Sequence, residues 1–159
     1  MIRIRPYDVS DDAWLTTMLG TPWGRITIVS RERSHPVGGL DLVAWETDDG
    51  AHGILGLDVK DGGMEVVILH AESTCTGLGR VLMEHAREKA LSASCNRLWL
   101  VTTNANVNAQ GFYEHLGLRR CAIHAGAIEL MRRMKPLIPT HDEQGTPIRD
   151  EFEYEWRTM

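Results

Sequence analysis

The segment best suited to chemistry is the junction at residues 69–80, where an apolar run ends and a helix begins at Gly77 and Gly79. The start of a helix presents unpaired backbone N–H groups and roughly half a positive charge. Glycine lets a ligand approach such groups closely. The junction therefore predicts a pyrophosphate cradle, although a bare Gly-x-Gly is also common in ordinary turns. It is not a P-loop, because no Gly-Lys-Ser/Thr follows, and Leu82 replaces the third glycine of a dinucleotide fingerprint.

A second, more specific pattern occupies residues 104–118, where Asn106, Ala109, Phe112 and Tyr113 are followed by Leu116-Gly117-Leu118. The chain here resembles the GNAT superfamily of N-acetyltransferases, whose helix carries N-x-x-A-x-x-F-Y, and Gly77 and Gly79 match the family's Q/R-x-x-G-x-G/A signature. The order of segments fits over about residues 2–124, and the run Trp23-Gly24 and the tail from Lys135 resemble a bacterial subgroup of the family.

The resemblance implies a fold of the α/β (α+β) class, with a mixed, mostly antiparallel central sheet and flanking helices. It also implies acetyl-CoA as co-substrate without a metal, and direct attack on the thioester by a primary amine of a small molecule or a protein. Pantetheine and oxygen contacts are expected from the end of a strand, and phosphate contacts from the glycine loop. The expected cofactor-binding residues are Leu69, His70, Ala71, Cys75, Thr76, Gly77, Leu78, Gly79, Arg80, Asn106 and Tyr113.

Two residues are the catalytic candidates. The resemblance places the acid that protonates the leaving thiolate at Tyr113, and Glu65 lies on the strand that leads to the cradle, where a base must keep the amine neutral. His70 and Glu72 at the end of that strand are alternative bases. The structural alternatives are that Tyr113 only packs its ring, that Glu65 is a solvated residue, and that Asn106 only caps its helix.

The chain departs from the family at Thr74-Cys75-Thr76, where Gln or Arg, then Gly, then Lys or Arg are usual. A positive charge and a glycine are thereby lost, whereas the backbone N–H donors remain. Three functions stay open: an N-acetyltransferase, a catalytically degenerate acyl-CoA-binding or sensing domain, and an interaction module whose tail mediates dimerisation.

The elements that position these residues follow from hydrophobic periodicity. A single domain over residues 1–159 is expected, with Glu32–Gly39 as a loop and residues 136–159 as a loop plus a closing strand. In residues 150–157, Phe152, Tyr154 and Trp156 alternate with acidic residues that we expect on a solvated outer face. The strands are predicted at residues 2–6, 25–30, 40–46, 52–58, 64–70, 98–102, 118–124 and 150–157. Two helices are predicted at residues 104–116 and 127–135. Two more are predicted from their apolar residues: a short one with Trp14, Leu15, Met18 and Leu19 that Gly20 ends, and one after Gly77 with Leu78, Leu82, Ala86 and Ala90 on one face.

Net charge, hydropathy and the cysteine pattern argue against several classes of protein. The chain has 159 residues and a formal net charge of −5, which argues against a nucleic-acid-binding protein. No run approaches the ~20 apolar residues of a membrane helix, and the N-terminus does not read as a signal peptide. The three cysteines form no C-x-x-C pair, which favours reduced thiols and the cytoplasm. A homodimer is left open.

Overall fold

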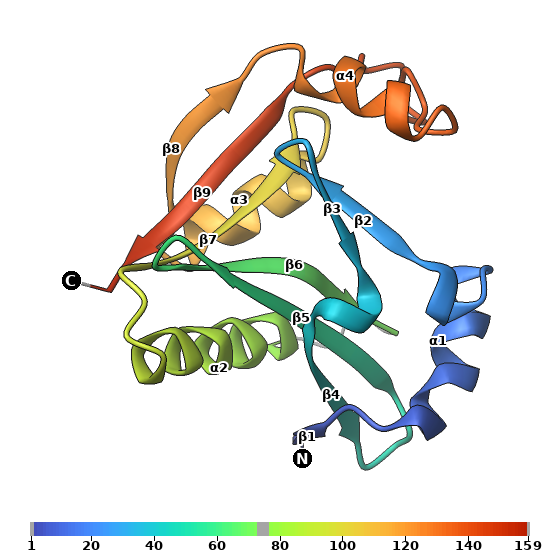
Figure 1. Ribbon diagram of the computed structural model, residues 1–159, viewed down its shortest axis with the longest axis vertical. Coiled ribbons are helices and arrows are strands. Elements are labelled where there is room, and N and C mark those ends of the chain that lie inside the picture. Colours follow the sequence, from blue (N-terminus) through green and yellow to red (C-terminus); the bar gives the residue numbers. More distant parts are fainter. Residues whose placement is uncertain (1, 73–76, 159) are drawn as a thin grey trace.

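The centre of the fold is a seven-stranded sheet with the strand order β1-β4-β5-β6-β7-β9-β8. The computed structural model describes residues 2–72 and 77–158 (Figure 1). Neighbouring strands are antiparallel apart from the parallel pair β6 and β7, which α2 connects. This confirms the mixed, mostly antiparallel sheet. The strands are β1 (Ile2–Pro6), β4 (Asp41–Thr47), β5 (His52–Lys60), β6 (Gly63–Ala71), β7 (Arg97–Thr103), β8 (Arg119–His124) and β9 (Glu151–Arg157).

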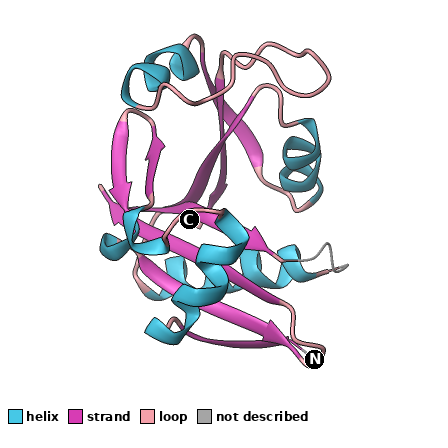
Figure 2. Ribbon diagram, turned by 90° about the vertical axis from the view of Figure 1, so that its right-hand side faces the viewer, coloured by secondary structure: helices cyan, strands magenta, loops and turns pink. Residues whose placement is uncertain are grey.

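Helices cover both faces of the sheet (Figures 1 and 2). One face packs against α2 and α3, where Met83 and Ala86 join a core with Leu55 and Leu98. The other face carries α1, whose Leu15 packs in a second core with residues of β4 and β5. The helices are α1 (Asp12–Leu19), α2 (Leu78–Ser92), α3 (Val107–His115) and α4 (Ala127–Met134), and the 3₁₀ turns are η1 (Val9–Asp11), η2 (Trp23–Arg25) and η3 (Val37–Gly39).

A separate hairpin corrects one expectation. The segment predicted as a loop, Glu32–Gly39, contains β3 (Arg33–Pro36), which pairs with β2 (Thr27–Ser30). The two turn residues, Arg31 and Glu32, have φ values of 47° and 63°. A two-residue hairpin turn with positive φ usually carries Asn or Gly, so this turn lacks its ordinary sequence signal. The hairpin lies on the same face of the sheet as α1 (Figure 1).

The closing strand β9 lies between β7 and β8. Tyr154 is fully buried, and Phe152 and Trp156 pack against the core of the α2 face. The expectation that the acidic residues of this strand face solvent is wrong. Glu151 is only 2% exposed, and Glu153 accepts a hydrogen bond from Arg97 at 2.8 Å. Cationic partners allow these carboxylates to lie on a covered face.

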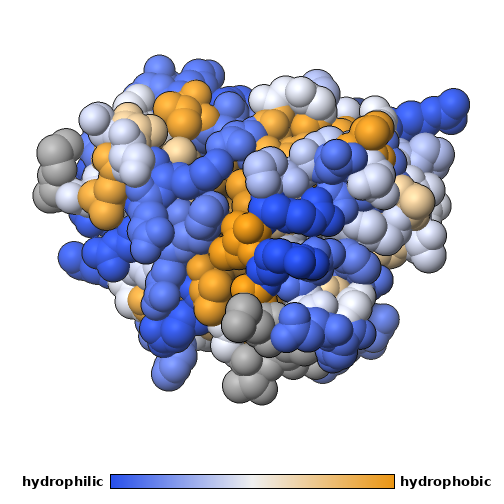
Figure 3. Space-filling model, turned by 90° about the horizontal axis from the view of Figure 1, so that it is seen from below, coloured by the Kyte–Doolittle hydropathy of each residue, from blue (hydrophilic) through white to orange (hydrophobic). Residues whose placement is uncertain are grey.

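The face of the molecule that Figure 3 shows is mainly polar. Seen from below, a narrow strip of apolar side chains runs between two hydrophilic areas (Figure 3). Among the residues that the structure describes, no helix is both long and apolar enough to cross a membrane.

Candidate active site

The parallel pair β6 and β7 separates in the middle of the sheet. The two strands are paired from Gly63 opposite Arg97 to Glu65 opposite Trp99, and their described pairing ends there. β6 nevertheless continues to Ala71 and β7 to Thr103. We call this region the β6–β7 divergence. Backbone groups along a strand that loses its neighbour can bind an extended ligand as an added strand would.

A bulge marks the same stretch of β6. The register with β5 passes from Leu57 opposite Val66 to Gly56 opposite Ile68, so Val67 is the extra residue. A bulge leaves one residue outside the regular ladder and redirects the side chains that follow it. Beyond the bulge, Leu69 is half-buried, whereas His70 and Ala71 are exposed at the end of the strand. These three predicted contact residues therefore lie together beside the divergence.

The cradle follows β6 directly, and part of it is described. Gly77 caps α2 with a φ of 90°, a left-handed conformation that favours glycine. The side chain of Leu78 is buried, so only its backbone can face a ligand. Arg80, half-exposed in the first turn, lies 3.6 Å from Glu84 and brings a positive charge to this end of the helix. The predicted contacts of Cys75 and Thr76 lie outside the described residues.

The packing of α2 against α3 requires a glycine at position 79. A Cβ built on Gly79 would lie 2.6 Å from the ring of Phe112. The missing side chain thus allows α2 and α3 to approach each other through the aromatic residue of the N-x-x-A-x-x-F-Y motif. Close packing of the helices accounts for this glycine without any ligand, and its role toward a coenzyme stays a prediction.

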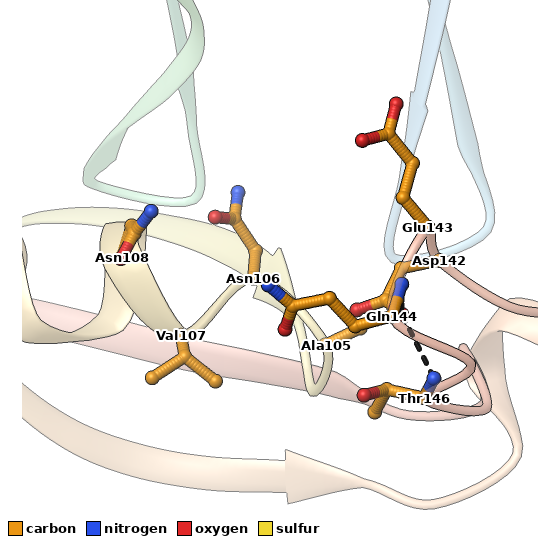
Figure 4. A pocket seen from close by; sticks show the side chains of 8 residues that line it. All are labelled: Ala105, Asn106, Val107, Asn108, Asp142, Glu143, Gln144 and Thr146. Carbon is orange, nitrogen blue, oxygen red and sulfur yellow. Dashed lines mark hydrogen bonds between the residues drawn. The ribbon is translucent and has the colours of Figure 1, made fainter.

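Asn106 begins α3. Its side-chain oxygen accepts a hydrogen bond from the backbone N–H of Ala109 at 3.3 Å, which is an N-cap. Asn106 also lines a pocket of about 330 Å³ with residues 142–146. Figure 4 shows the side chains of Asn106 and Asn108 on the same side as Glu143, with Val107 turned away. Since the oxygen serves the cap, the amide NH₂ of Asn106 is the group suited to a ligand.

Tyr113 lies in an aromatic cluster on the α2 face. Its ring centroid is 5.4 Å from that of Phe112 and 6.0 Å from that of Tyr154. Burial raises the pKa of Tyr113 to about 12, so its phenol keeps its proton at neutral pH. The residue therefore packs its ring, and its hydroxyl has the protonation state that a general acid requires.

Glu65 sits at the last paired position before the divergence, with its side chain on the face of the hairpin β2–β3. It is 1% exposed, so the alternative of a solvated residue is wrong. Ser30 Oγ lies 2.5 Å from its Oε1. Its Oε2 has no hydrogen-bond partner among the described residues, but His35 Nε2 and Arg33 Nη1 lie 3.6 Å and 3.7 Å from it. Burial raises the pKa of Glu65 from its ordinary 4.5 to about 7, against the lowering effects of the Ser30 hydrogen bond and the Arg33 charge.

A chain of polar groups continues from Glu65 toward the surface. His35 Nε2 lies 2.9 Å from Ser30 Oγ, and His35 Nδ1 lies 3.3 Å from Asp58 Oδ2. His35 is 4% exposed, whereas the side chain of Asp58 is 27% exposed. Burial and the charge of Arg33 lower the pKa of His35, which favours its neutral form. We call Glu65, Ser30, His35 and Asp58 the buried relay.

The relay admits two hydrogen-bonding arrangements. With a neutral Glu65, its O–H donates to Ser30, Ser30 donates to Nε2 of His35, and Nδ1–H donates to Asp58. With an ionised Glu65, Ser30 donates to the carboxylate, and His35 donates from both ring nitrogens. The two states differ by one proton moved from Glu65 to His35. Sequence reasoning missed Ser30, His35 and Asp58, because they come from three strands and form no local motif.

The other candidate bases have different surroundings. Glu72 accepts a hydrogen bond from the backbone N–H of His52 at 2.7 Å and lies 3.2 Å from its ring. His70 is exposed. Among the described residues, no group of three or more His, Cys, Asp or Glu side chains is arranged to hold a metal ion.

Comparison with known protein sequences gives a family and two relatives. The model of the acetyltransferase (GNAT) family matches residues 4–118. YdhI of Bacillus subtilis is 42% identical over 96 residues, which cover 60% of this chain and 59% of YdhI, less than two thirds of its length. YxbD of the same organism is 30% identical over 131 residues, which cover 82% of each chain.

Solved structures of the same architecture cover nearly the whole chain. A Bacillus subtilis acetyltransferase in complex with CoA superposes with a TM-score of 0.75 at 18% identity, covering 100% of both chains. A GNAT acetyltransferase of Elizabethkingia anophelis with acetyl-CoA bound has a TM-score of 0.70 at 14% identity, covering 98% of this chain and 97% of its own. At these identities the likeness shows the fold.

Proposed function

The chain belongs to the GNAT family of acetyltransferases, and on that premise we propose that it transfers the acetyl group of acetyl-CoA to a primary amine by direct attack. The observation that carries the proposal is the carboxyl group of Glu65, buried at the β6–β7 divergence with one oxygen that accepts no hydrogen bond from the described residues. A buried carboxylate with a strongly raised pKa at such a place is typical of a catalytic base.

Glu65 would take the proton of the amine. Alkyl amines are protonated at neutral pH and must lose a proton before they can attack, and a base whose pKa lies near the working pH does this best. The Oε2 atom of Glu65, which makes no hydrogen bond to the described residues, would be the accepting atom. Through Ser30, the buried relay can then pass a proton to His35, whose other ring nitrogen faces the part-exposed Asp58. The relay thereby restores the carboxylate.

Tyr113 would supply a proton on the other side of the reaction. The amine nitrogen bonds to the carbonyl carbon, the carbon–sulfur bond breaks, and the thiolate takes the phenolic proton. The nitrogen loses its remaining extra proton as the amide forms, and an equivalent proton returns to the phenolate of Tyr113 from solvent. Tyr113 packs on the α2 face, whereas Glu65 faces the hairpin β2–β3. Base and acid therefore serve opposite faces of the sheet, which suits an amine that arrives on one face and a thiol that leaves on the other.

The residues present also suit the coenzyme, which supplies the activated acyl group. The end of β6 and the start of α2 would hold it, with Leu69, His70 and Ala71 toward the pantetheine arm and the backbone at Gly77–Arg80 toward the pyrophosphate. The left-handed Gly77 and the cation of Arg80 support this assignment. Asn106 would contribute its amide NH₂.

One observation favours a second candidate, a sensing domain that binds acyl-CoA without turnover. The segment Thr74-Cys75-Thr76 lacks the cation and the glycine that the family usually carries there. A weakened cradle can still bind a coenzyme through backbone N–H groups, so binding alone does not separate the two functions.

The experiment measures CoA release with a panel of primary amines, and acetyl-CoA affinity by calorimetry. We expect Glu65→Gln to lower kcat/KM for the amine about 10²–10⁴-fold, with acetyl-CoA affinity unchanged within about twofold. The comparison variant is Glu72→Gln, which removes the alternative base at the exposed end of the same segment and should retain activity if Glu65 is the base. Full activity of Glu65→Gln would refute the role of Glu65. Acetyl-CoA binding by a wild-type protein that acetylates no amine would favour the sensing domain.

A further inference from the structure

An apolar pocket of about 370 Å³ opens on the hairpin face of the sheet, between α1, η2, β2 and the end of β6. Its wall is almost entirely hydrophobic, and the polar residues at it are His70 and Lys135. The side-chain nitrogen of Lys135 contacts the backbone carbonyl of Thr27, which fixes this cation at the pocket. The hydrophobic residues that matter here are Met18, Trp23, Ile28, Ile54, Val67 and Leu69.

The pocket lies next to Glu65 along two strands at once. On β2, Ile28 lines the pocket, and Ser30, two residues further on, is bonded to Glu65. On β6, Val67 lines the pocket and Glu65 precedes it by two residues. Two residues of a strand span about 7 Å, and in the regular strand β2 side chains two apart share a face. On β6 the bulge at Val67 interrupts this alternation, but Ile68 beyond it also lines the pocket and packs in the core of the hairpin face. A ligand in the pocket can therefore place one end at the carboxyl of Glu65.

The lining defines what this ligand must be. Apolar walls favour a compact alkyl or aryl group, because burying it removes hydrophobic surface from water. No Asp or Glu is among the described residues that line the pocket, and the ammonium of Lys135 repels a second positive charge. Resting on the proposed function, we infer that the acceptor is a primary amine with a compact hydrophobic body and no second cationic group, held in this pocket with its nitrogen toward Glu65.

A second pocket has a lining that favours the opposite class of ligand. The pocket beside Asn106 is lined by Asp142 and Glu143 and would suit a polycation. It draws its lining from the start of α3 and the loop at residues 142–146, and it includes no residue of β2 or β6. A preference for polyamines would therefore point away from the apolar pocket.

The test uses the full chain with two amines of similar length, isoamylamine and putrescine. We expect kcat/KM for isoamylamine to exceed that for putrescine at least tenfold. In Ile28→Asp, the ratio of kcat/KM for isoamylamine to that for putrescine should be at least tenfold lower than in wild type, because the variant places an anion in the pocket. Met18→Glu, at a second half-buried wall position, should act in the same direction and guards against misfolding of one variant. Leu137→Asp is the matched control, since Leu137 is 95% exposed outside the pocket, and it should leave the ratio unchanged.

Saturation-transfer NMR on isoamylamine without acetyl-CoA separates the two proposals. Binding that Ile28→Asp abolishes, in a protein that acetylates no amine, would support the pocket and refute the transferase. Acetylation of isoamylamine that neither pocket variant changes would refute the pocket and leave the transferase standing. A wild-type preference for putrescine would also overturn the inference.

Discussion

Burial of Glu65 lowers the free energy of unfolding when its carboxyl group is ionised. Folding raises its pKa from 4.5 to about 7, so the folded chain keeps the proton over a pH range in which the unfolded chain releases it. The free energy of unfolding therefore falls as the pH rises from about 4.5 to about 7, and the full cost is present above pH 7. A shift of this size corresponds to about 3 kcal/mol at most.

Replacement of Glu65 by Gln removes this titration. We expect Glu65→Gln to be more stable than wild type at pH 8, by up to about 3 kcal/mol, and close to wild type near pH 4.5. The contribution of His35 is common to both proteins and cancels in the difference to first order. Urea unfolding at the two pH values, with Glu72→Gln as control, measures the effect. An equal difference at both pH values would mean that Glu65 is ionised at neutral pH without a cost.

Tyr113 allows a kinetic test at the same scale. Tyr113→Phe keeps the ring contacts with Phe112 and Tyr154 and removes the hydroxyl. We expect kcat to fall about 10²-fold or more, with acetyl-CoA affinity unchanged, because a general acid acts on the chemical step. Steady-state kinetics on an accepted amine give the result. Retention of full kcat would assign the proton to solvent or another group.

At this scale the sequence predicts the individual candidates better than their surroundings. Tyr113 and Asn106 belong to a motif within one helix, and Glu65 is a candidate because it lies on the strand that leads to the cradle. Ser30 and His35 lie on either side of a hairpin turn without Gly or Asn, and Asp58 comes from a third strand. Only the packing of the hairpin on β6 brings them to Glu65, and nothing local in the sequence encodes it.

The contact between α2 and α3 depends on one missing side chain. A Cβ at Gly79 would overlap the ring of Phe112, so we expect Gly79→Ala to lower the free energy of unfolding by about 1–3 kcal/mol. Gly111→Ala, in open space on α3, should instead stabilise by up to about 1 kcal/mol through helix propensity. Chemical denaturation of both variants tests the pair.

A double-mutant cycle tests whether the new methyl group at position 79 meets the side chain of Phe112. Phe112→Leu should recover part of the loss caused by Gly79→Ala, because the smaller side chain makes room for the new methyl group. Strictly additive effects would show that the cost of the alanine arises elsewhere, for example from the backbone of the first turn of α2.

Hydrophobic periodicity predicts which segments form helices and strands, but it does not predict the order of the strands in the sheet. The apolar runs predict the strands around the core, and the four-residue recurrence predicts α2. The place of β9 between β7 and β8 is a non-local pairing, and its alternating pattern resembles that of a half-exposed strand. The ion pairs of Glu151 with Arg31 and of Glu153 with Arg97 are what allow this strand to be covered on its acidic face.

For the whole molecule, the position of β9 predicts a strong dependence on the tail. Removal of residues 148–159 takes away the neighbour of both β7 and β8 and three aromatic side chains. Each buried aromatic contributes roughly 1.5–3 kcal/mol, against about 5–15 kcal/mol for a typical domain. We expect the truncated chain to lose its cooperative thermal transition in circular dichroism. A chain ending at Thr158 is the control, and a sharp transition of the truncated chain near the full-length value would contradict the expectation.

The central position of β9 also affects folding while the chain is being synthesised. Ribosomes add residues in order, so β7, β8 and the segment carrying α4 emerge before the strand that joins them. Until then, two strand edges of the nascent chain lack their neighbour, and such edges pair readily with other chains. Production of this protein should therefore be most prone to aggregation when translation stalls or stops between β8 and β9, and a chaperone that shields strand edges would act in that interval.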